Sequence, residues 1–365
     1  MTTKKSKRIF YFDALRALAI ISVIVFHVIN GATSKMVVLN PDLYHSLSWF
    51  FADIMRNGFR IGVVLFLMLS GALSMGRQWS IKSFLSKRIP RIVFPFLLWG
   101  SFFIIVLTIT GYYFNFPPLF TNPPIVDFGS FVLRSFLGAN YFFHHFWFFW
   151  MIIGTYLIMP IFNKWIANSK LDELEYFLVI WLVTCLFTFT LHTEFPIKLV
   201  YFTSPIGLVV LGYYLRYTER KLLNNPYFDL LLVLLPVAAM VIISYLMSPA
   251  GKMYTFDRYS IFIAIEVIGV FLLFKNFGKF NLNFKFLSND DGIFRKSIYV
   301  LARYSYGLYL AHFPILRLLM KFISSKTLPY KVSVASLFLL DLGITLVLLY
   351  LFSKLPYIKE YIGVK

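Results

Sequence analysis

Residues 12–28 read FDALRALAIISVIVFHV, an apolar run that is interrupted by two ionisable side chains, Arg16 and His27. A step of eleven residues, at about 100° per residue, returns to within about 20° of its starting direction. Both side chains therefore lie on one helix face, about 16 Å apart along the axis. Ionisable groups at such depths in a membrane are costly unless they face protein or water. This stretch predicts a membrane-spanning helix with a functional face.

The composition places the rest of the chain in the membrane as well. Of its 365 residues, 59% are hydrophobic and only 14% are charged, and the mean hydropathy is +0.75. Only helices or closed barrels satisfy their backbone groups in lipid, and the alternating strands of a barrel are absent from the sequence. The expected fold is an all-α polytopic integral membrane protein, with one transmembrane domain over residues 1–365.

Apolar segments predict about ten transmembrane helices. Their approximate bounds are 10–29, 59–75, 92–111, 145–164, 174–191, 197–215, 228–247, 257–275, 298–318 and 332–353. The longest outer connection, 112–144, contains several prolines that exclude a continuous helix. Within it, residues 128–137 are expected to form a short interfacial helix.

The positions of lysine and arginine predict that both termini are cytoplasmic. In that orientation 22 of the 35 basic residues lie in cytoplasmic segments and nine in outer loops, as the positive-inside rule requires. Because the formal net charge of +19 is spread over these loops, no nucleic-acid partner is expected. Arg16 is then near the cytoplasm and His27 near the exterior.

Cys185 is the only cysteine, which excludes a disulfide framework and a cysteine-ligated metal site. No metal is expected at all. Since Cys185 lies inside an apolar run, it is expected to be an inert packing residue.

Arg88 and Arg91 stand three residues apart around Pro90, in the stretch FLSKRIPRIVFPFLLW, which suits the first turn of the third span. One interpretation is ordinary anchoring at a cytoplasmic helix start. The other is a phosphate site at the inner surface, because two guanidinium groups on one face and the helix dipole all favour an anion.

Other polar residues within the spans are candidates for lining a cavity, each with a structural alternative. Asp13, one turn before Arg16, either neutralises and orients that arginine or forms only a structural ion pair. Ser70, in the stretch IGVVLFLMLSGAL, lies beside Gly71, and small residues at such spacing also permit close helix packing.

The fourth and ninth spans supply four more candidates. His145 and Trp147 lie in HHFWFFWMIIGTYLIMP, where an aromatic belt is also expected. Tyr309 and His312 lie in LARYSYGLYLAHFPIL. His312, near the outer end of its helix, is either a second polar wall of the same cavity or a structural histidine.

The order of these motifs resembles the membrane-bound acyltransferase-3 family over nearly the whole chain. Arg16 and His27 match the arginine and histidine of its first span, and Arg88 and Arg91 match its R-x-x-R motif. The stretch 66–71 is similar to its phenylalanine-rich second-span signature, although many members have an acidic residue nearby, where this chain has a valine.

The resemblance implies a multi-pass enzyme of the plasma membrane, expected in a prokaryote. Such enzymes move an acyl group, usually acetyl, from cytosolic acyl-CoA to a hydroxyl of a cell-surface or lipid-linked glycan. His27 and Arg16 are then catalytic, and Arg88 and Arg91 bind acyl-CoA. Some members carry a fused SGNH esterase-like domain, and this chain is expected to lack one.

A transporter or flippase of a polysaccharide precursor is the alternative function, since it also places ionisable residues in membrane spans. Inverted repeats and interrupted helices, which are typical of transporters, are not apparent in the sequence. An arginine pair at the inner surface suits a nucleotide-bearing donor better. The sequence therefore favours the acyltransferase.

Overall fold

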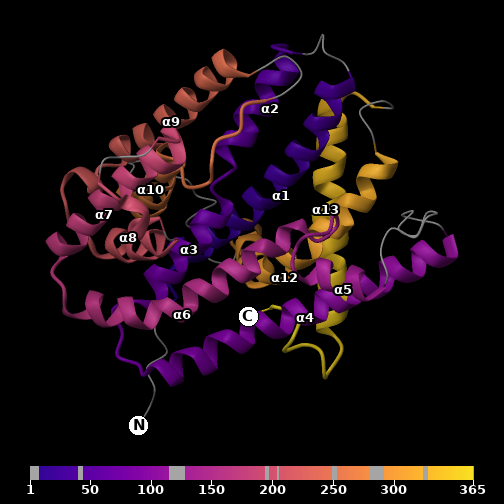
Figure 1. Ribbon diagram of the computed structural model, residues 1–365, viewed down its shortest axis with the longest axis horizontal. Helices are drawn as coiled ribbons and strands as arrows, with labels where there is room; N and C mark the ends of the chain where they lie inside the picture. The colour runs from indigo at the N-terminus through magenta and orange to yellow at the C-terminus, as the bar shows by residue number, and fades with distance from the viewer. Residues whose placement is uncertain are drawn as a thin grey trace.

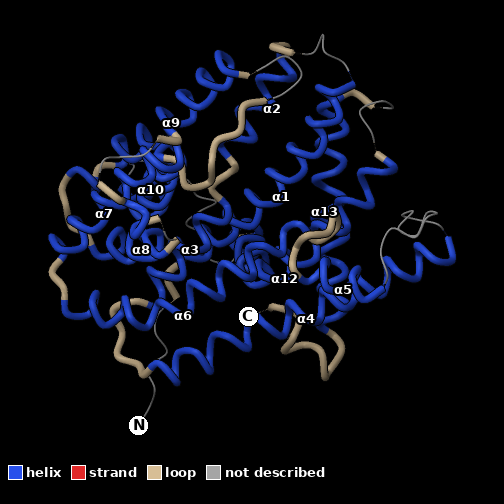
Figure 2. Tube along the Cα trace, viewed as in Figure 1, coloured by secondary structure: helices blue, strands red, loops and turns tan. Residues whose placement is uncertain are grey.

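The computed structural model describes residues 8–39, 44–114, 128–193, 197–203, 205–248, 253–279, 292–323 and 328–364. Within these residues the fold is all-α, and Figure 2 shows helices joined by loops, with no strand in the described part. The long helices are α1 (Phe10–Leu39), α4 (Ile81–Phe114), α6 (Trp147–Asn168), α7 (Leu171–Leu186), α9 (Pro226–Met247), α10 (Ile261–Asn276), α12 (Ile293–Phe322) and α13 (Tyr330–Ser353). The shorter ones are α2 (Leu47–Gly58), α3 (Gly62–Ser74), α5 (Phe128–Phe136) and α8 (Ile206–Tyr217).

Eight helical segments of the described chain are long and apolar enough to cross a membrane. They are α1, α2 together with α3, α4, α6, α7, α9, α10 and α13. Helix α12 has 30 residues but is too polar to count among them, and α8 is apolar but has only 12 residues. Each of the ten predicted spans coincides with a helix, whereas the number of membrane crossings stays a prediction.

Three predicted spans differ from the helices in extent. The third helix begins at Ile81 instead of residue 92, so Pro90 lies inside α4 and not in its first turn. The second begins in α2 and is interrupted between α2 and α3. The sixth begins only at Ile206, directly after Pro205. Hydropathy finds the apolar part of a helix and not the polar turns or breaks beside it.

Helix α1 is central to the packing. It lies against α12, α3, α13, α2 and α10, and Figure 1 shows it crossing the middle of the molecule. Helix α12 also packs on α13 and α4, while α3 pairs with α8 and α9 pairs with α10. The short helix α5 lies against α4 and confirms the helix predicted over residues 128–137. Helix α1 therefore packs directly on α3 and α12, two of the helices that carry candidate residues.

Glycines permit the close contact between α3 and α8. A Cβ atom at Gly71 would lie 1.9 Å from the backbone oxygen of Val209, and one at Gly212 would lie 2.0 Å from the backbone oxygen of Met68. Only hydrogen fits at either position, so the two backbones touch. Gly71 therefore permits close helix packing, as the small residues in its stretch of sequence predict. Cys185, as expected, is fully buried.

Candidate active site

Two cavities meet at Tyr309, whose side chain lines both of them. The first, named here the Arg88 cavity, has a volume of about 580 Å³ and is lined by residues of α1, α3, α4, α6, α12 and the C-terminal segment. The second, the His27 cavity, has a volume of about 410 Å³ and is lined by residues of α1, α3, α6 and α12 and by the loops before α3, α6 and α10. The predicted single cavity is thus two cavities with a shared wall.

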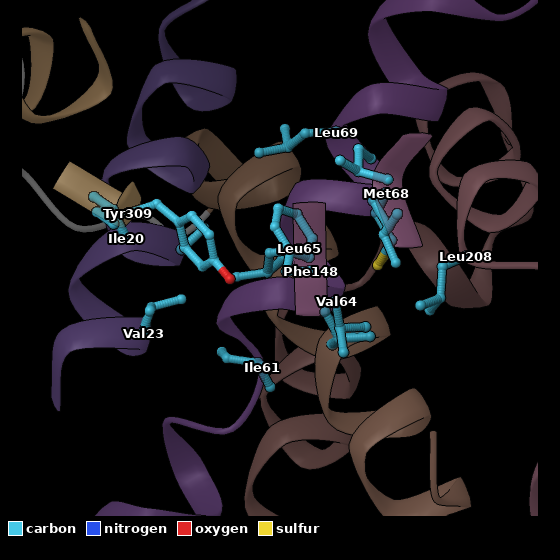
Figure 3. Close-up of a cluster of buried hydrophobic side chains, with 14 of the residues drawn as sticks. Ile20, Val23, Ile61, Val64, Leu65, Met68, Leu69, Phe148, Leu208 and Tyr309 are labelled. Carbon is cyan, nitrogen blue, oxygen red and sulfur yellow. The ribbon is translucent and has the colours of Figure 1, made fainter. Parts of the chain in front are cut away.

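Tyr309 forms this wall because it is held firmly in the core. Its side chain is 2% exposed and lies among Ile20 and Val23 of α1 and Phe148 of α6, as Figure 3 shows. The ring centroids of Tyr309 and Phe148 are 4.9 Å apart. The Tyr309 hydroxyl donates a hydrogen bond to the backbone oxygen of His145. Tyr309 is therefore a fixed part of the wall of both cavities.

The Arg88 cavity is strongly cationic. Four arginines line it, and Glu360 is the one carboxylate among its described lining residues. The arginines are Arg16 of α1, Arg88 and Arg91 of α4, and Arg303 of α12. Tyrosine and serine hydroxyls complete the polar wall and come from Ser70, Tyr156, Ser305, Tyr306 and Tyr309. A ligand with several negative charges fits the four guanidinium groups best.

Arg88 and Arg91 lie on the same face of α4, as their spacing predicts, and both line the cavity. Arg88 is held in place because its Nη2 donates a hydrogen bond of 2.7 Å to the Oγ of Ser74, at the end of α3. Arg91 is exposed at the mouth. One guanidinium is therefore oriented in advance, and the other is accessible to an incoming ligand.

Asp13 lies behind Arg16 and is not part of the cavity wall. Its Oδ1 is 3.5 Å from Nη1 of Arg16, and its Oδ2 accepts a hydrogen bond of 2.5 Å from Nε of Arg8. The hydrogen bond to Asp13 raises the pKa of the Arg8 guanidinium, which stays charged. Because Asp13 is shared by two arginines, it orients Arg16 without fully neutralising it.

His27 lies in the second cavity. Its ring centroid is 4.7 Å from that of Phe313 and 5.5 Å from that of His312. Neither ring nitrogen of His27 has a hydrogen-bond partner among the described residues. Trp147 and the exposed His144 line the same cavity. An imidazole with a free nitrogen facing a cavity is suited to accept a proton from a bound hydroxyl.

His145 and His312 are fully buried behind the wall and line neither cavity. The Nδ1 of His312 lies 2.9 Å from the backbone oxygen of Leu308, so it carries the proton and donates. The Nε2 of His145 likewise donates to the backbone oxygen of Leu310, at 3.1 Å. These bonds fix one tautomer of each ring, which fits the structural interpretation of His312.

Several cavity residues were not among the sequence candidates. Arg60, Arg303 and Arg317 carry a charge in or beside an apolar span, and that is a usable signal. Arg258 lies in a loop, where an arginine is common and does not indicate a functional site. Among the described residues, no group of three or more His, Cys, Asp or Glu side chains is placed to hold a metal ion.

Comparison with known proteins identifies the family. Residues 9–354 match the family model described as an acyltransferase domain, Acyl_transf_3, which spans nearly the whole chain. No curated protein and no solved structure matches the chain. With its apolar helices and this match, the chain is a multi-pass membrane protein that belongs to the acyltransferase-3 family.

Proposed function

We propose that this protein is an O-acyltransferase that moves an acyl group, expected to be acetyl, from cytosolic acyl-CoA to a hydroxyl of a cell-surface or lipid-linked glycan. The proposed location is the plasma membrane of a prokaryotic cell. The observation that carries the proposal is that an arginine-rich cavity and a histidine-bearing cavity share Tyr309 as a lining residue.

The Arg88 cavity is the proposed donor site. Coenzyme A carries several phosphate charges, and guanidinium groups bind phosphate oxygens through paired, charge-assisted hydrogen bonds. Arg91 and Arg303 are exposed and can meet the nucleotide first, whereas Arg16 lies deeper beside Asp13. The narrow pantetheine arm then extends along the cavity, with the thioester directed toward Tyr309.

The His27 cavity is the proposed acceptor site, and His27 is the proposed base. The imidazole accepts the proton of the acceptor hydroxyl while that oxygen attacks the thioester carbonyl. The new C–O ester bond forms, the C–S bond breaks, and the coenzyme A thiolate leaves. The proton on His27 then passes to this thiolate, directly or through water, which restores the neutral imidazole. Since the two substrates enter different cavities, the reacting atoms meet beside Tyr309.

Purified protein in lipid nanodiscs tests this proposal with acetyl-CoA and a panel of soluble glycosides, read by release of free thiol and by mass spectrometry of the glycoside. His27→Gln keeps a polar side chain but cannot accept the proton, so we expect transfer to fall by about 10² to 10⁴. Coenzyme A binding to this variant should stay within about twofold of the original.

His192→Asn is the matched control, because His192 is exposed, lines neither cavity and has a left-handed backbone that asparagine tolerates. It should transfer at the original rate. Full transfer by a well-folded His27→Gln protein would remove the base role from this histidine. Acetyl-CoA that fails to bind the original protein at millimolar concentration would contradict the donor assignment.

A further inference from the structure

The His27 cavity carries three guanidinium groups that have no part in the acyl transfer step. Arg60 lies between α2 and α3, Arg258 precedes α10, and Arg317 belongs to α12. These three residues, named here the outer arginines, come from separate elements and converge on the cavity that contains His27. Three positive charges from separate parts of the chain in one cavity require a physical explanation.

Aromatic rings, and not carboxylates, hold these groups in position. The Cζ of Arg258 lies 3.7 Å from the ring centroid of Trp147, and that of Arg317 lies 3.9 Å from the ring centroid of Tyr141. The Cζ of Arg60 lies 5.1 Å from the ring of Phe26. Cation–π contacts orient a guanidinium but leave its full charge in place.

No carboxylate balances this charge inside the cavity. Among the described lining residues there is no Asp or Glu, and none of the outer arginines forms an ion pair with a described residue. Asp257, next to Arg258 in the chain, does not line the cavity, and its Oδ1 accepts a hydrogen bond of 2.7 Å from the backbone N–H of Tyr259. Within the described structure, the buried Nε atoms of Arg60 and Arg317 have no hydrogen-bond partner.

Three like charges that face one cavity repel each other, and partial burial removes part of the water that would screen them. Unpaired buried N–H groups add a further cost. An anion with several oxygen atoms would remove both costs at once, because it supplies opposite charge and acceptors for planar guanidinium donors. The cavity is therefore complementary to a negatively charged ligand.

We infer that the acceptor is anionic, with a carboxylate or phosphate group that the outer arginines bind while His27 faces a neighbouring hydroxyl. This inference rests on the proposed function, because it takes the His27 cavity as the acceptor site. It adds the chemical class of the acceptor, an acidic or phosphorylated glycan, and gives the outer arginines a role in its selection.

Matched probes separate charge from shape. Methyl glucuronoside and its neutral primary amide carry the same ring hydroxyls and differ only in charge, and methyl glucoside 6-phosphate supplies the phosphate arm. Binding of each to the full chain in phosphatidylcholine nanodiscs is measured by isothermal titration, and acyl transfer from acetyl-CoA is measured on the same samples. At least one anionic probe should bind roughly tenfold more tightly than the amide, the size of one charge-assisted hydrogen bond.

Variants of the outer arginines test whether these residues cause the preference for the anionic probe. Arg258→Gln and Arg60→Gln should each remove most of the preference for the anionic probe and leave binding of the amide within twofold. Arg134→Gln is the matched control, because Arg134 is an exposed arginine of α5 that lines neither cavity. It should keep the full preference.

Five outcomes would contradict the inference or the proposed function. Equal binding of the anionic and neutral probes, or no binding of any probe at about 10 mM, overturns the inference. If phosphatidylglycerol in the nanodisc abolishes the preference, the outer arginines form a lipid headgroup site and the inference is also overturned. Selective anion binding without any transfer supports the anion site but contradicts the acyltransferase, whereas equally efficient transfer to both glucuronosyl probes supports the acyltransferase and overturns the inference.

Discussion

Tyr309 lies between the two proposed substrates, so its ring controls what reaches the thioester. Tyr309→Phe loses only the hydrogen bond to the backbone oxygen of His145, and we expect a loss of about 1 kcal/mol in stability and transfer within about tenfold of the original. Tyr309→Ala removes the wall itself and should admit water. We expect it to release free coenzyme A from acetyl-CoA without any acceptor.

Thiol release in the absence of a glycoside distinguishes the two variants. A Tyr309→Ala protein that folds, binds coenzyme A and shows no hydrolysis above the original protein would mean that another group separates the cavities during turnover.

Arg88 and Arg91 share one face of the proposed donor site, so both should matter for coenzyme A binding. Replacement of either by Ala should weaken binding by about 1.5 to 3 kcal/mol, and Lys should restore little because it cannot form a bidentate phosphate contact. Lys87→Ala is the control, since Lys87 is an exposed cation of the same helix outside the cavity. Unchanged binding in both alanine variants would leave only the anchoring interpretation.

The sequence located some of these residues and missed others for a physical reason. A charge inside an apolar run is visible locally, because its cost in lipid is a property of that run, and this signal identified Arg16 and His27. Tyr309 was a candidate for lining a cavity, but its position in the walls of both cavities depends on the packing of α12, which is distant in sequence from α1. Arg258 was not a candidate, because an arginine in a loop carries no local signal until the fold brings that loop to the cavity.

At the scale of elements, the contact between α3 and α8 depends on glycine. Gly71→Ala places a Cβ against the backbone of Val209, which cannot move as a side chain tip can, so we expect about 1 to 3 kcal/mol of destabilisation and a lower Tm. Gly154→Ala is the matched control in α6, because its Cβ would meet nothing within 4 Å. That variant should be neutral or slightly more stable.

Thermal unfolding in one detergent compares the two variants. Equal Tm values would show that α3 and α8 separate at little cost, which would weaken the geometry proposed for the Arg88 cavity, since Ser70 and its neighbours reach that cavity from α3.

The sequence predicted which segments are helices, because a long apolar run is a strong signal. It did not predict where these helices begin and end. The polar start of α4 adds eleven residues before the predicted span, which would begin at residue 92, and those residues include Arg88 and Arg91. Helix α12 begins only five residues before its predicted span, but the polar residues that line the cavities lower its apolarity, so it is not among the eight most apolar helical segments of the described chain. Hydropathy therefore locates the apolar middle of a helix but not the polar turns in which some of the cavity residues lie.

At the scale of the whole molecule, a helix that lines both cavities shows in which direction the chain runs from one cavity to the other. Helix α1 runs from Arg16 in the Arg88 cavity to His27 in the other, and α12 runs the same way from Arg303 to Arg317. These helices correspond to the first and ninth predicted spans. Both are odd-numbered, so both should cross in the same direction, as they do.

Two even-numbered spans, the second and the fourth, run in the opposite direction. Helix α3 passes from Gly62 in the His27 cavity to Ser70 in the Arg88 cavity, and α6 passes from Trp147 to Tyr156 in the same sense. Four helices of the described chain, α7 to α10, lie between α6 and α12. If one of them did not cross the membrane, α12 would have to run in the same direction as α6. The observed directions therefore support a crossing by the short helix α8, which the ten-span count requires.

This arrangement leads to a prediction about the two sides of the membrane. If the termini are cytoplasmic, the Arg88 cavity faces the cytoplasm, and Ala139 lies outside because it precedes α6, beside residues of the His27 cavity. Gly278, after the end of α10, lies inside. Both positions are exposed, and a Cβ at Gly278 would meet nothing within 4 Å. The buried native Cys185 should give no background label.

An impermeant maleimide applied to intact cells should therefore label Ala139→Cys and leave Gly278→Cys unlabelled, while permeabilised cells should label both. The original chain, with Cys185 alone, is the control for background. Label on Gly278→Cys and not on Ala139→Cys in intact cells would place His27 toward the cytoplasm. Because acyl-CoA is cytosolic, the proposed donor cavity would then face the wrong side, and the direction of acyl transfer would have to be rejected.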